Sequence, residues 1–168
     1  MDVSDLQVMQ KGIEMLNFDK EYFKDEEREG FLVESMMKRA WASQLEVLMV
    51  IDGICKKYGI QYFIFWGTLL GAVRHKGYVP WDDDMDIIMK RADFQRFITV
   101  ARYEMPKDYT LLSLYTEPEW NDLIARVVNT CGIDCSEGFL DQFHGCPYAC
   151  GIDIFPYDYM VEDPEQQK

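Results

Sequence analysis

The sequence lacks an apolar run long enough to span a membrane, and it lacks the basic, apolar leader of a secreted protein. It is also poor in basic residues: 17 Lys and Arg stand against 30 Asp and Glu, which gives a formal net charge of −13 at pH 7. A general basic patch for nucleic acid or for an anionic membrane is therefore not expected. These absences predict a cytoplasmic protein with no transmembrane segment and no nucleic-acid partner.

Disulfides are not expected either, because five cysteines are an odd number in a chain without a secretory signal. Internal repeats and low-complexity tracts are absent. The 168 residues, 48% hydrophobic and 14% aromatic, are typical of one domain with a substantial core. The last stretch, GIDIFPYDYMVEDPEQQK, changes from apolar to polar, so we expect either a C-terminally incomplete fragment or a short member of a longer family.

Two parts of the chain differ in composition. Residues 1–33 are rich in charge, and we interpret them as a peripheral charged helix and linker. Residues 34–168 carry the apolar patterns of a folded core. The clearest pattern is an apolar stripe with a spacing of three or four positions from Ser35 to Tyr58, which predicts a helix that ends at Gly59.

Short β-branched and aromatic runs alternate with amphipathic segments in this core. The run from Ile60 to Trp66 predicts a buried strand, LLGAV after Gly67 and Thr68 predicts a short helix, and DMDIIM, residues 84–89, predicts a second strand. We also expect a helix over residues 92–103, with Phe94, Phe97, Ile98 and Ala101 facing inward, and strands within residues 109–115, 123–129 and 151–158. This order predicts an α/β fold with a mixed β-sheet flanked by helices.

A cluster of carboxylates accompanies the second predicted strand. Asp82, Asp83 and Asp84 are adjacent, and Asp86 follows. Because side chains alternate along a strand, Asp84 and Asp86 are expected on one face while Met85 points into the core. Two such carboxylates repel each other unless a hard cation binds them, which favours Mg²⁺ or Mn²⁺. A solvated acidic turn is the alternative.

A candidate anion site precedes the acidic cluster. Gly67 and Thr68 stand at the start of the short predicted helix, where backbone N–H groups can bind phosphate oxygens. Arg74, His75 and Lys76 add positive charge between this helix and the aspartates. An ordinary solvated turn has the same composition, so both hypotheses stay open for these three residues.

Two segments, FWGTLLGAVRHKGYVPWDDDMDI and GIDIFPYDYM, resemble in this order the signature blocks of the LicD family, relatives of the fukutins within the nucleotidyltransferase-fold superfamily. The resemblance implies that the Gly67–Thr68 turn holds substrate phosphates and that Asp84 and Asp86 bind a metal ion. It also implies a third carboxylate on a later strand. Asp153 is the candidate, because an unpaired charge is costly to bury in an apolar strand. An exposed aspartate at a strand end is the alternative.

The same resemblance implies a reaction, the transfer of a phosphorylated alcohol, typically phosphocholine, from a cytidine diphosphate (CDP) donor such as CDP-choline. The acceptor would be a hydroxyl of a cell-surface glycan, such as lipopolysaccharide or teichoic acid, and the enzyme could work at the inner face of the membrane. Catalysis would need neutralised phosphate oxygens, with Arg74 and Arg126 as further contacts. Asp153 would orient or deprotonate the acceptor, and neutralising it is expected to leave the metal-free protein equally or more stable.

Two other hypotheses stay open. One is a nucleotidyltransferase that adds a nucleoside monophosphate to a small hydroxyl compound, and the other is a non-catalytic module that binds metal or nucleotide. A structural Zn²⁺ site is a separate possibility, because two pairs of cysteines have the same three-residue spacing: Cys131, Cys135, Cys146 and Cys150. Packing of small buried thiols is the alternative for these four residues.

Overall fold

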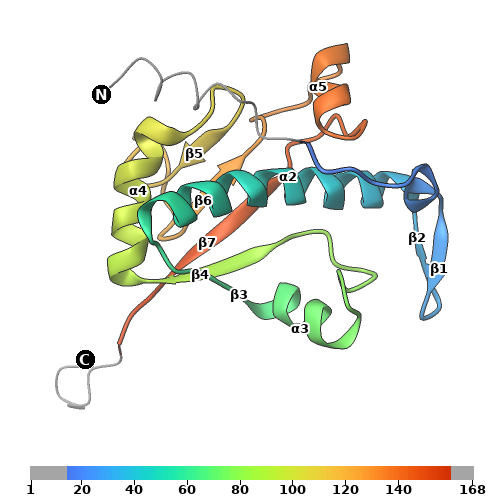
Figure 1. Cartoon of the computed structure of the whole chain (residues 1–168), viewed down its shortest axis with the longest axis horizontal. Helices are drawn as coiled ribbons and strands as arrows, with labels where there is room; N and C mark the ends of the chain where they lie inside the picture. The colour runs from blue at the N-terminus through green and yellow to red at the C-terminus, as the bar shows by residue number, and fades with distance from the viewer. Residues whose placement is uncertain (1–14, 160–168) are drawn as a thin grey trace.

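The computed structural model describes residues 15–159 and has a mixed five-stranded sheet at its centre (Figure 1). The strand order is β3-β4-β7-β6-β5, in which β4 and β7 are parallel and the other neighbours are antiparallel. The strands are β3 (Phe63–Ile64), β4 (Asp86–Lys90), β5 (Thr110–Leu112), β6 (Ala125–Val128) and β7 (Gly151–Tyr157). The α/β class with a mixed sheet is confirmed.

Helices α2 (Ser35–Tyr58) and α4 (Arg91–Glu104) pack on one face of the sheet. The core between them and the sheet includes Ile87 of β4 and Ile154 of β7, both fully buried. Both helices were predicted from the spacing of their apolar residues, and both bury one side against the sheet. Helix α2 ends at Gly59, whose φ of +61° is the left-handed conformation that favours glycine. Side chains that alternate with the core positions of β4, β6 and β7 therefore point to the opposite face.

Two predicted strands are shorter than expected. Ile60 N donates to Cys55 O and completes the end of α2, while α3 (Trp66–Arg74) begins immediately after β3, so only two residues of the predicted strand pair. Strand β4 begins at Asp86 rather than Asp84. The carbonyl groups of the two residues before Asp84 are bound by side chains of α2 instead of by a neighbouring strand.

The charged N-terminal region, residues 1–33, was predicted as a helix and linker, and the structure describes only part of it. Residues 1–14 of it lie outside the described part, and the remainder forms a 3-10 turn, η1 (Lys20–Phe23), and a hairpin of β1 (Glu26–Arg28) and β2 (Phe31–Val33). Glu29 and Gly30 make the hairpin turn with φ values of +53° and +77°, a two-residue turn that favours glycine at its second position. The short helix α5 (Glu137–Gln142) was not predicted from the sequence.

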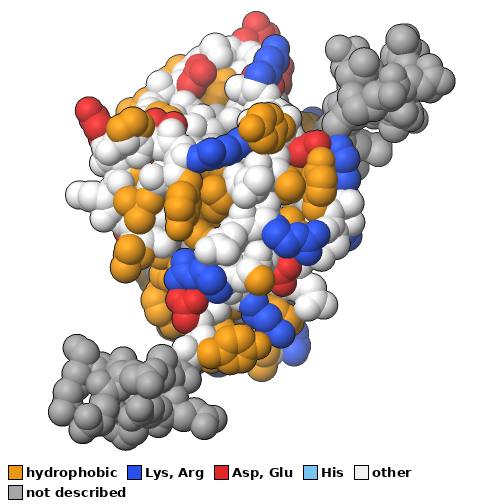
Figure 2. Space-filling model, turned by 90° about the vertical axis from the view of Figure 1, so that its left-hand side faces the viewer, with side chains coloured by type: hydrophobic (Ala, Val, Ile, Leu, Met, Phe, Trp, Pro, Cys, Tyr) orange, Lys and Arg blue, Asp and Glu red, His pale blue; other side chains and the backbone are white. Residues whose placement is uncertain are grey.

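The end of the molecule that carries α4 displays Lys and Arg side chains scattered among hydrophobic ones (Figure 2). On α4 itself, Arg91 pairs with Asp158, and Arg96 donates to the carbonyl oxygen of Tyr58. Arg91 and Arg96 thus both form contacts with other residues of the fold.

Within residues 15–159, no helix combines the length and the apolar character needed to cross a lipid bilayer.

Candidate active site

Three charged side chains lie in a row across the sheet face that faces away from α2 and α4. Asp86 of β4 and Asp153 of β7 are register partners, and Arg126 of β6 is the partner of Asp153 on its other side. Neighbouring strands are about 4.8 Å apart, so the three residues are direct neighbours. Arg126 binds Asp153 through two hydrogen bonds, Nε to Oδ1 and Nη2 to Oδ2. Two strands close in space but distant in sequence thus bring Asp153 beside Asp86.

At the β4 end of this row, the negative charge of the carboxylates is not balanced by an ion pair such as the one between Asp153 and Arg126. Asp86 is only 7% exposed, and burial, followed by the charges of Asp84 and Asp153, raises its pKa to about 6. The pKa of Asp84 is also raised, first by desolvation and then by Asp82. Negative charge is therefore concentrated where Asp84 leads into β4, and a bound cation would relieve it.

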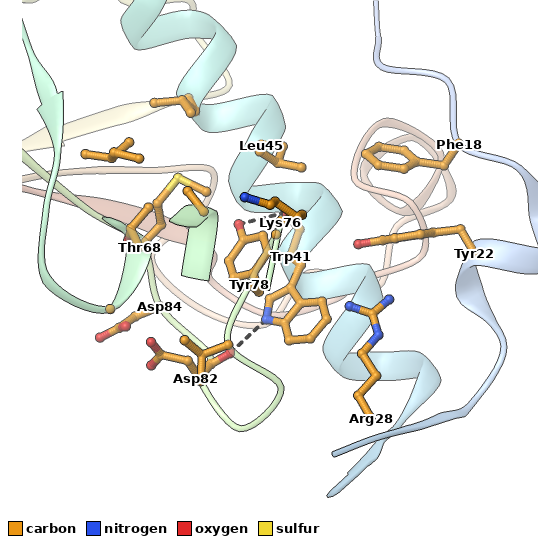
Figure 3. Close-up of a pocket in the computed structure, with 17 residues that line it drawn as sticks. Phe18, Tyr22, Arg28, Trp41, Leu45, Thr68, Lys76, Tyr78, Asp82 and Asp84 are labelled. Carbon is orange, nitrogen blue, oxygen red and sulfur yellow. Dashed lines mark hydrogen bonds between the residues drawn. The ribbon is translucent and has the colours of Figure 1, made fainter. Parts of the chain in front are cut away.

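Helix α2 fixes the acidic loop by two hydrogen bonds that the sequence did not reveal. Trp41 Nε1 donates to Asp82 O over 2.9 Å, and Gln44 Nε2 donates to Asp83 O over 2.7 Å. Trp41 belongs to the apolar stripe of α2, so its sequence position indicates a core residue and carries no signal of this second role. These bonds hold the backbone of the loop, while the carboxylates of Asp82 and Asp84 are directed away from α2 (Figure 3).

The Gly67–Thr68 turn lies against the same loop. Asp86 N donates to Thr68 Oγ1 over 2.8 Å, which ties the first turn of α3 to the start of β4. A Cβ on Gly67 would lie 2.2 Å from Asp82 Oδ2, so a larger residue at this position would displace the Asp82 carboxylate from its present place. The preceding Trp66 has a φ of +40°, a strained conformation for a bulky residue. The predicted phosphate turn and the predicted metal carboxylates are therefore adjacent.

The three basic residues at the end of α3 have different surroundings. Arg74 Nε donates to His75 Nε2 over 2.8 Å, and His75 Nδ1 lies 3.1 Å from Glu29 Oε1 of the N-terminal hairpin. Lys76 is exposed, and its Nζ donates to Val73 O. Of the three, only Lys76 lines the cavity beside the aspartates, so the structure brings one of the three predicted phosphate contacts to this place.

A cavity of about 600 Å³ adjoins the Gly67–Thr68 turn (Figure 3). Its walls come from α2, α3, the acidic loop and the N-terminal segment, and Thr68, Asp82 and Asp84 lie at one end. Phe18 and Tyr22 contribute from the opposite side, from a region that its charge content marked as a linker. Its size suits a small organic substrate.

The carboxylates have the donor chemistry of a Mg²⁺ or Mn²⁺ site. Mg²⁺ is usually held by one or two carboxylates together with substrate phosphates, and Asp84 and Asp86 supply two. Across residues 15–159, no three His, Cys, Asp or Glu side chains are arranged as a ready-made metal centre. The third predicted ligand, Asp153, is instead held by Arg126. The residues fit a cation shared with substrate better than a closed protein cage.

The four cysteines predicted as a zinc site are not brought together. Cys131 and Cys135 are exposed, whereas Cys146 and Cys150 are buried with their sulfur atoms 3.6 Å apart. The spacing of the pairs gave no information about the loop and the helix α5 that lie between them. Packing accounts for the buried pair, because both thiols are buried. Cys150 directly precedes β7, and its backbone N–H donates to Asn129 Oδ1.

Comparison with known proteins supplies an independent result. Residues 59–122 match the family model described as "LicD/FKTN/FKRP, nucleotidyltransferase domain". The lipopolysaccharide cholinephosphotransferase LicD of Haemophilus influenzae is 33% identical over 123 residues, which cover 72% of this chain and 44% of that protein. An uncharacterised protein of Rickettsia typhi is 57% identical over 117 residues, which cover 64% of this chain and 31% of that protein.

A shorter match reaches the ribitol 5-phosphate transferase FKRP of Homo sapiens, 38% identical over 42 residues, which cover 25% of this chain and 8% of that protein. The chain thus spans less than half the length of each of these relatives. The region matched by the family model contains the Gly67–Thr68 turn, Asp84 and Asp86, but neither Asp153 nor the N-terminal segment that lines the cavity.

Proposed function

Since the chain carries a LicD-family nucleotidyltransferase domain, we propose that it transfers a phosphorylated alcohol from a CDP-activated donor to a hydroxyl group of a cell-surface glycan. The observation that carries this proposal is the alignment of Asp86, Asp153 and Arg126 on one sheet face, next to Asp84, which lines a substrate-sized cavity. The LicD relative from Haemophilus influenzae is a lipopolysaccharide cholinephosphotransferase, which supports lipopolysaccharide as the class of acceptor.

Asp84 and Asp86 would hold Mg²⁺ or Mn²⁺. A divalent cation at this place supplies charge neutralisation for the phosphate oxygens and for the diphosphate leaving group. Thr68, whose hydroxyl is already bound to the backbone N–H of Asp86, would place the donor phosphates next to these carboxylates. Lys76, which also lines the cavity, would add positive charge.

Asp153 and Arg126 would act as a pair. The two hydrogen bonds from Arg126 fix the orientation of the Asp153 carboxylate at the row, so Asp153 would first orient the acceptor hydroxyl. Acting as a general base would require Arg126 to release one carboxylate oxygen. Arg126 itself is 44% exposed at its side chain and would contact the incoming phosphate when it does so.

The decisive experiment measures release of cytidine monophosphate from CDP-choline and from CDP-ribitol by the whole chain, with and without Mg²⁺ and with a lipopolysaccharide acceptor. We expect release that depends on the cation and that is lost in Asp84→Asn. The exposed Asp83→Asn, one residue away, is the matched control and should retain activity. Release of pyrophosphate from cytidine triphosphate instead would assign a nucleotidyltransferase, and donor binding without turnover would leave only a binding module.

A further inference from the structure

A row of apolar side chains lies beside the charged row of the candidate active site. Phe63 of β3, Ile88 of β4 and Phe155 of β7 are register partners across three neighbouring strands. Ile88 comes two positions after Asp86, and Phe155 comes two positions after Asp153. Because side chains alternate along a strand, these residues share the face of the charged row and lie about 6.6 Å further along the strands. The sheet face thus carries a polar row and an apolar row side by side.

Trp66 packs against this apolar row. Its ring stacks on that of Phe65, with centroids 5.0 Å apart and an interplanar angle of 25°, and it meets the Phe155 ring at 62° with centroids 4.7 Å apart. Phe65 is fixed in turn, because its backbone N–H donates to Asp86 O over 3.0 Å. Phe65 covers one face of the indole, yet Trp66 remains 59% exposed. The indole ring is therefore held in place with much of its surface open to solvent.

The backbone of Trp66 is unusual for so large a residue. Its φ of +40° lies in the left-handed region, which glycine and asparagine adopt readily and bulky residues adopt rarely. A side chain this exposed gains little from burial, so core packing does not account for a tryptophan at this strained position. Strained residues are concentrated at binding and active sites. Contact with a ligand would account for the exposed ring.

The polar groups next to this ring suit a sugar. A sugar ring packs the apolar C–H groups of its face on an aromatic ring, while the hydroxyl groups at its edge need hydrogen-bond partners. Asp153 and Arg126 can be such partners, and the Arg126 side chain is 44% exposed. A purely apolar ligand would remove water from these charges and offer them no partner. An open-chain polyol has no continuous C–H face for Trp66 to contact.

We propose that Trp66 and Phe155 form the subsite for the acceptor glycan, in which Trp66 stacks on the C–H face of the sugar ring that reacts. Asp153, two residues before Phe155, orients the hydroxyl group of this ring, and the phosphate turn at Gly67 directly follows Trp66. The acceptor thus lies next to both the carboxylate and the donor phosphates. This inference rests on the proposed transferase function, and it adds the residues that bind the acceptor and the part of the acceptor that they recognise.

The test is a titration of the whole chain, followed by nuclear magnetic resonance, with methyl β-D-glucopyranoside, the open-chain polyol sorbitol and cytidine monophosphate as probes. The chain has four tryptophans, and the indole N–H signal of Trp66 is identified by its absence in Trp66→Phe. We expect the pyranoside to shift this signal and to bind roughly tenfold more tightly than sorbitol, because only the pyranoside has a ring face for the indole. A tenfold difference corresponds to about 55 Å² of buried apolar surface.

Trp66→Gly and Trp66→Asn remove the ring, and both new residues tolerate the left-handed backbone at this position. We expect each variant to bind the pyranoside roughly tenfold more weakly and to bind cytidine monophosphate as the wild type does. The melting temperature should stay close to that of the wild type, because relief of the backbone strain offsets the lost ring contacts. Trp66→Phe retains an aromatic face and should keep most of the affinity for the pyranoside.

Tyr103→Leu is the matched control, because Tyr103 is an exposed aromatic residue of α4, which packs on the opposite face of the sheet. If Trp66→Gly does not fold, Trp66→Asn provides the same comparison. Equal binding of the pyranoside and sorbitol, or unchanged binding of the pyranoside in both variants, would overturn the proposal. An equal loss of cytidine monophosphate affinity would assign the ring to the nucleotide and would overturn it as well.

The transfer assay separates this inference from the function on which it rests. With the core oligosaccharide of lipopolysaccharide as acceptor, Trp66→Gly should raise the KM for the acceptor and leave the KM for CDP-choline unchanged. Turnover with an unchanged acceptor KM would keep the transferase and reject the subsite. Absence of turnover in the wild type, together with selective binding of the pyranoside at Trp66, would reject the transferase and keep Trp66 as a sugar-binding residue.

Discussion

Asp86 and Asp153 face each other across the parallel pair β4 and β7, yet only Asp153 has a basic partner. Arg126 lies on the far side of Asp153, one strand further from Asp86. The charge of Asp153 is therefore balanced within the sheet, while Asp86 is buried among other carboxylates. This asymmetry gives the two residues opposite expected effects on stability.

Asp86→Asn should stabilise the metal-free protein at neutral pH. The pKa of Asp86 is raised to about 6 in the folded state, whereas an unfolded aspartate titrates near about 3.9. The folded state thus holds this proton more tightly, and the charge of Asp86 costs stability progressively as the pH rises from about 4 to about 6. We expect a gain of about 2 kcal/mol at pH 7 in urea denaturation.

The gain from Asp86→Asn should vanish near pH 4, where the carboxyl is protonated in the folded state. Asp83→Asn, on an exposed neighbour, is the control and should change stability little at either pH. A destabilised Asp86→Asn at pH 7 would show that this carboxylate has a compensating partner.

Asp153→Asn should destabilise the metal-free protein, contrary to the expectation from sequence. That expectation considered repulsion among three carboxylates, but the structure adds the ion pair with Arg126. Removing Asp153 leaves the guanidinium without its partner, and the partial exposure of Arg126 limits the loss to about 1 kcal/mol.

A double-mutant cycle with Arg126→Gln measures this ion pair directly. The two single variants should each lose stability, and the double variant should lose less than their sum. Additive losses would mean that the interaction between Asp153 and Arg126 contributes no stability, and that the pair has a role only in the active site.

Three glycine-to-alanine variants should differ in sign and size. A Cβ on Gly71 would lie 2.4 Å from the backbone oxygen of Gly77, which cannot move alone, so Gly71→Ala should cost about 2 kcal/mol or more. At Gly67 the obstacle is the side chain of Asp82, which can rotate away, so Gly67→Ala should cost less stability but impair donor binding. Gly53 lies within α2 and has open space around it.

Gly53→Ala is therefore the internal control, and it should gain about 0.5 to 1 kcal/mol from helix propensity. Thermal denaturation of the three variants, together with titration by cytidine monophosphate, checks the series. Unchanged donor binding in Gly67→Ala would separate the glycine turn from the substrate site.

Thiol labelling should divide the five cysteines into two groups. Cys131 and Cys135 are exposed and should react rapidly in the native protein. The buried thiols, Cys55, Cys146 and Cys150, should react fully only after unfolding. Elemental analysis should find no stoichiometric zinc. Zinc at one equivalent per chain, with four protected thiols, would instead restore the four-cysteine site.

The sequence by itself determined the elements whose signal is local. Helix α2 could be predicted from its apolar spacing and from Gly59, and α4 from the inward positions of Phe94 and Phe97, because burial on one side of a helix imposes a period on the sequence. It also determined that Asp84 and Asp86 accompany the start of a strand whose other face is core.

Only the tertiary structure decided which distant residues meet. The pairing of β4 with β7 sets Asp153 beside Asp86, and the pairing of β6 with β7 neutralises Asp153 with Arg126, although these strands are far apart in sequence. The hydrogen bond from Trp41 to the acidic loop and the place of Tyr22 in the cavity wall depend likewise on long-range packing. Contacts of this kind leave no periodic pattern, because each depends on the registers and positions of separate elements rather than on the order of neighbouring residues.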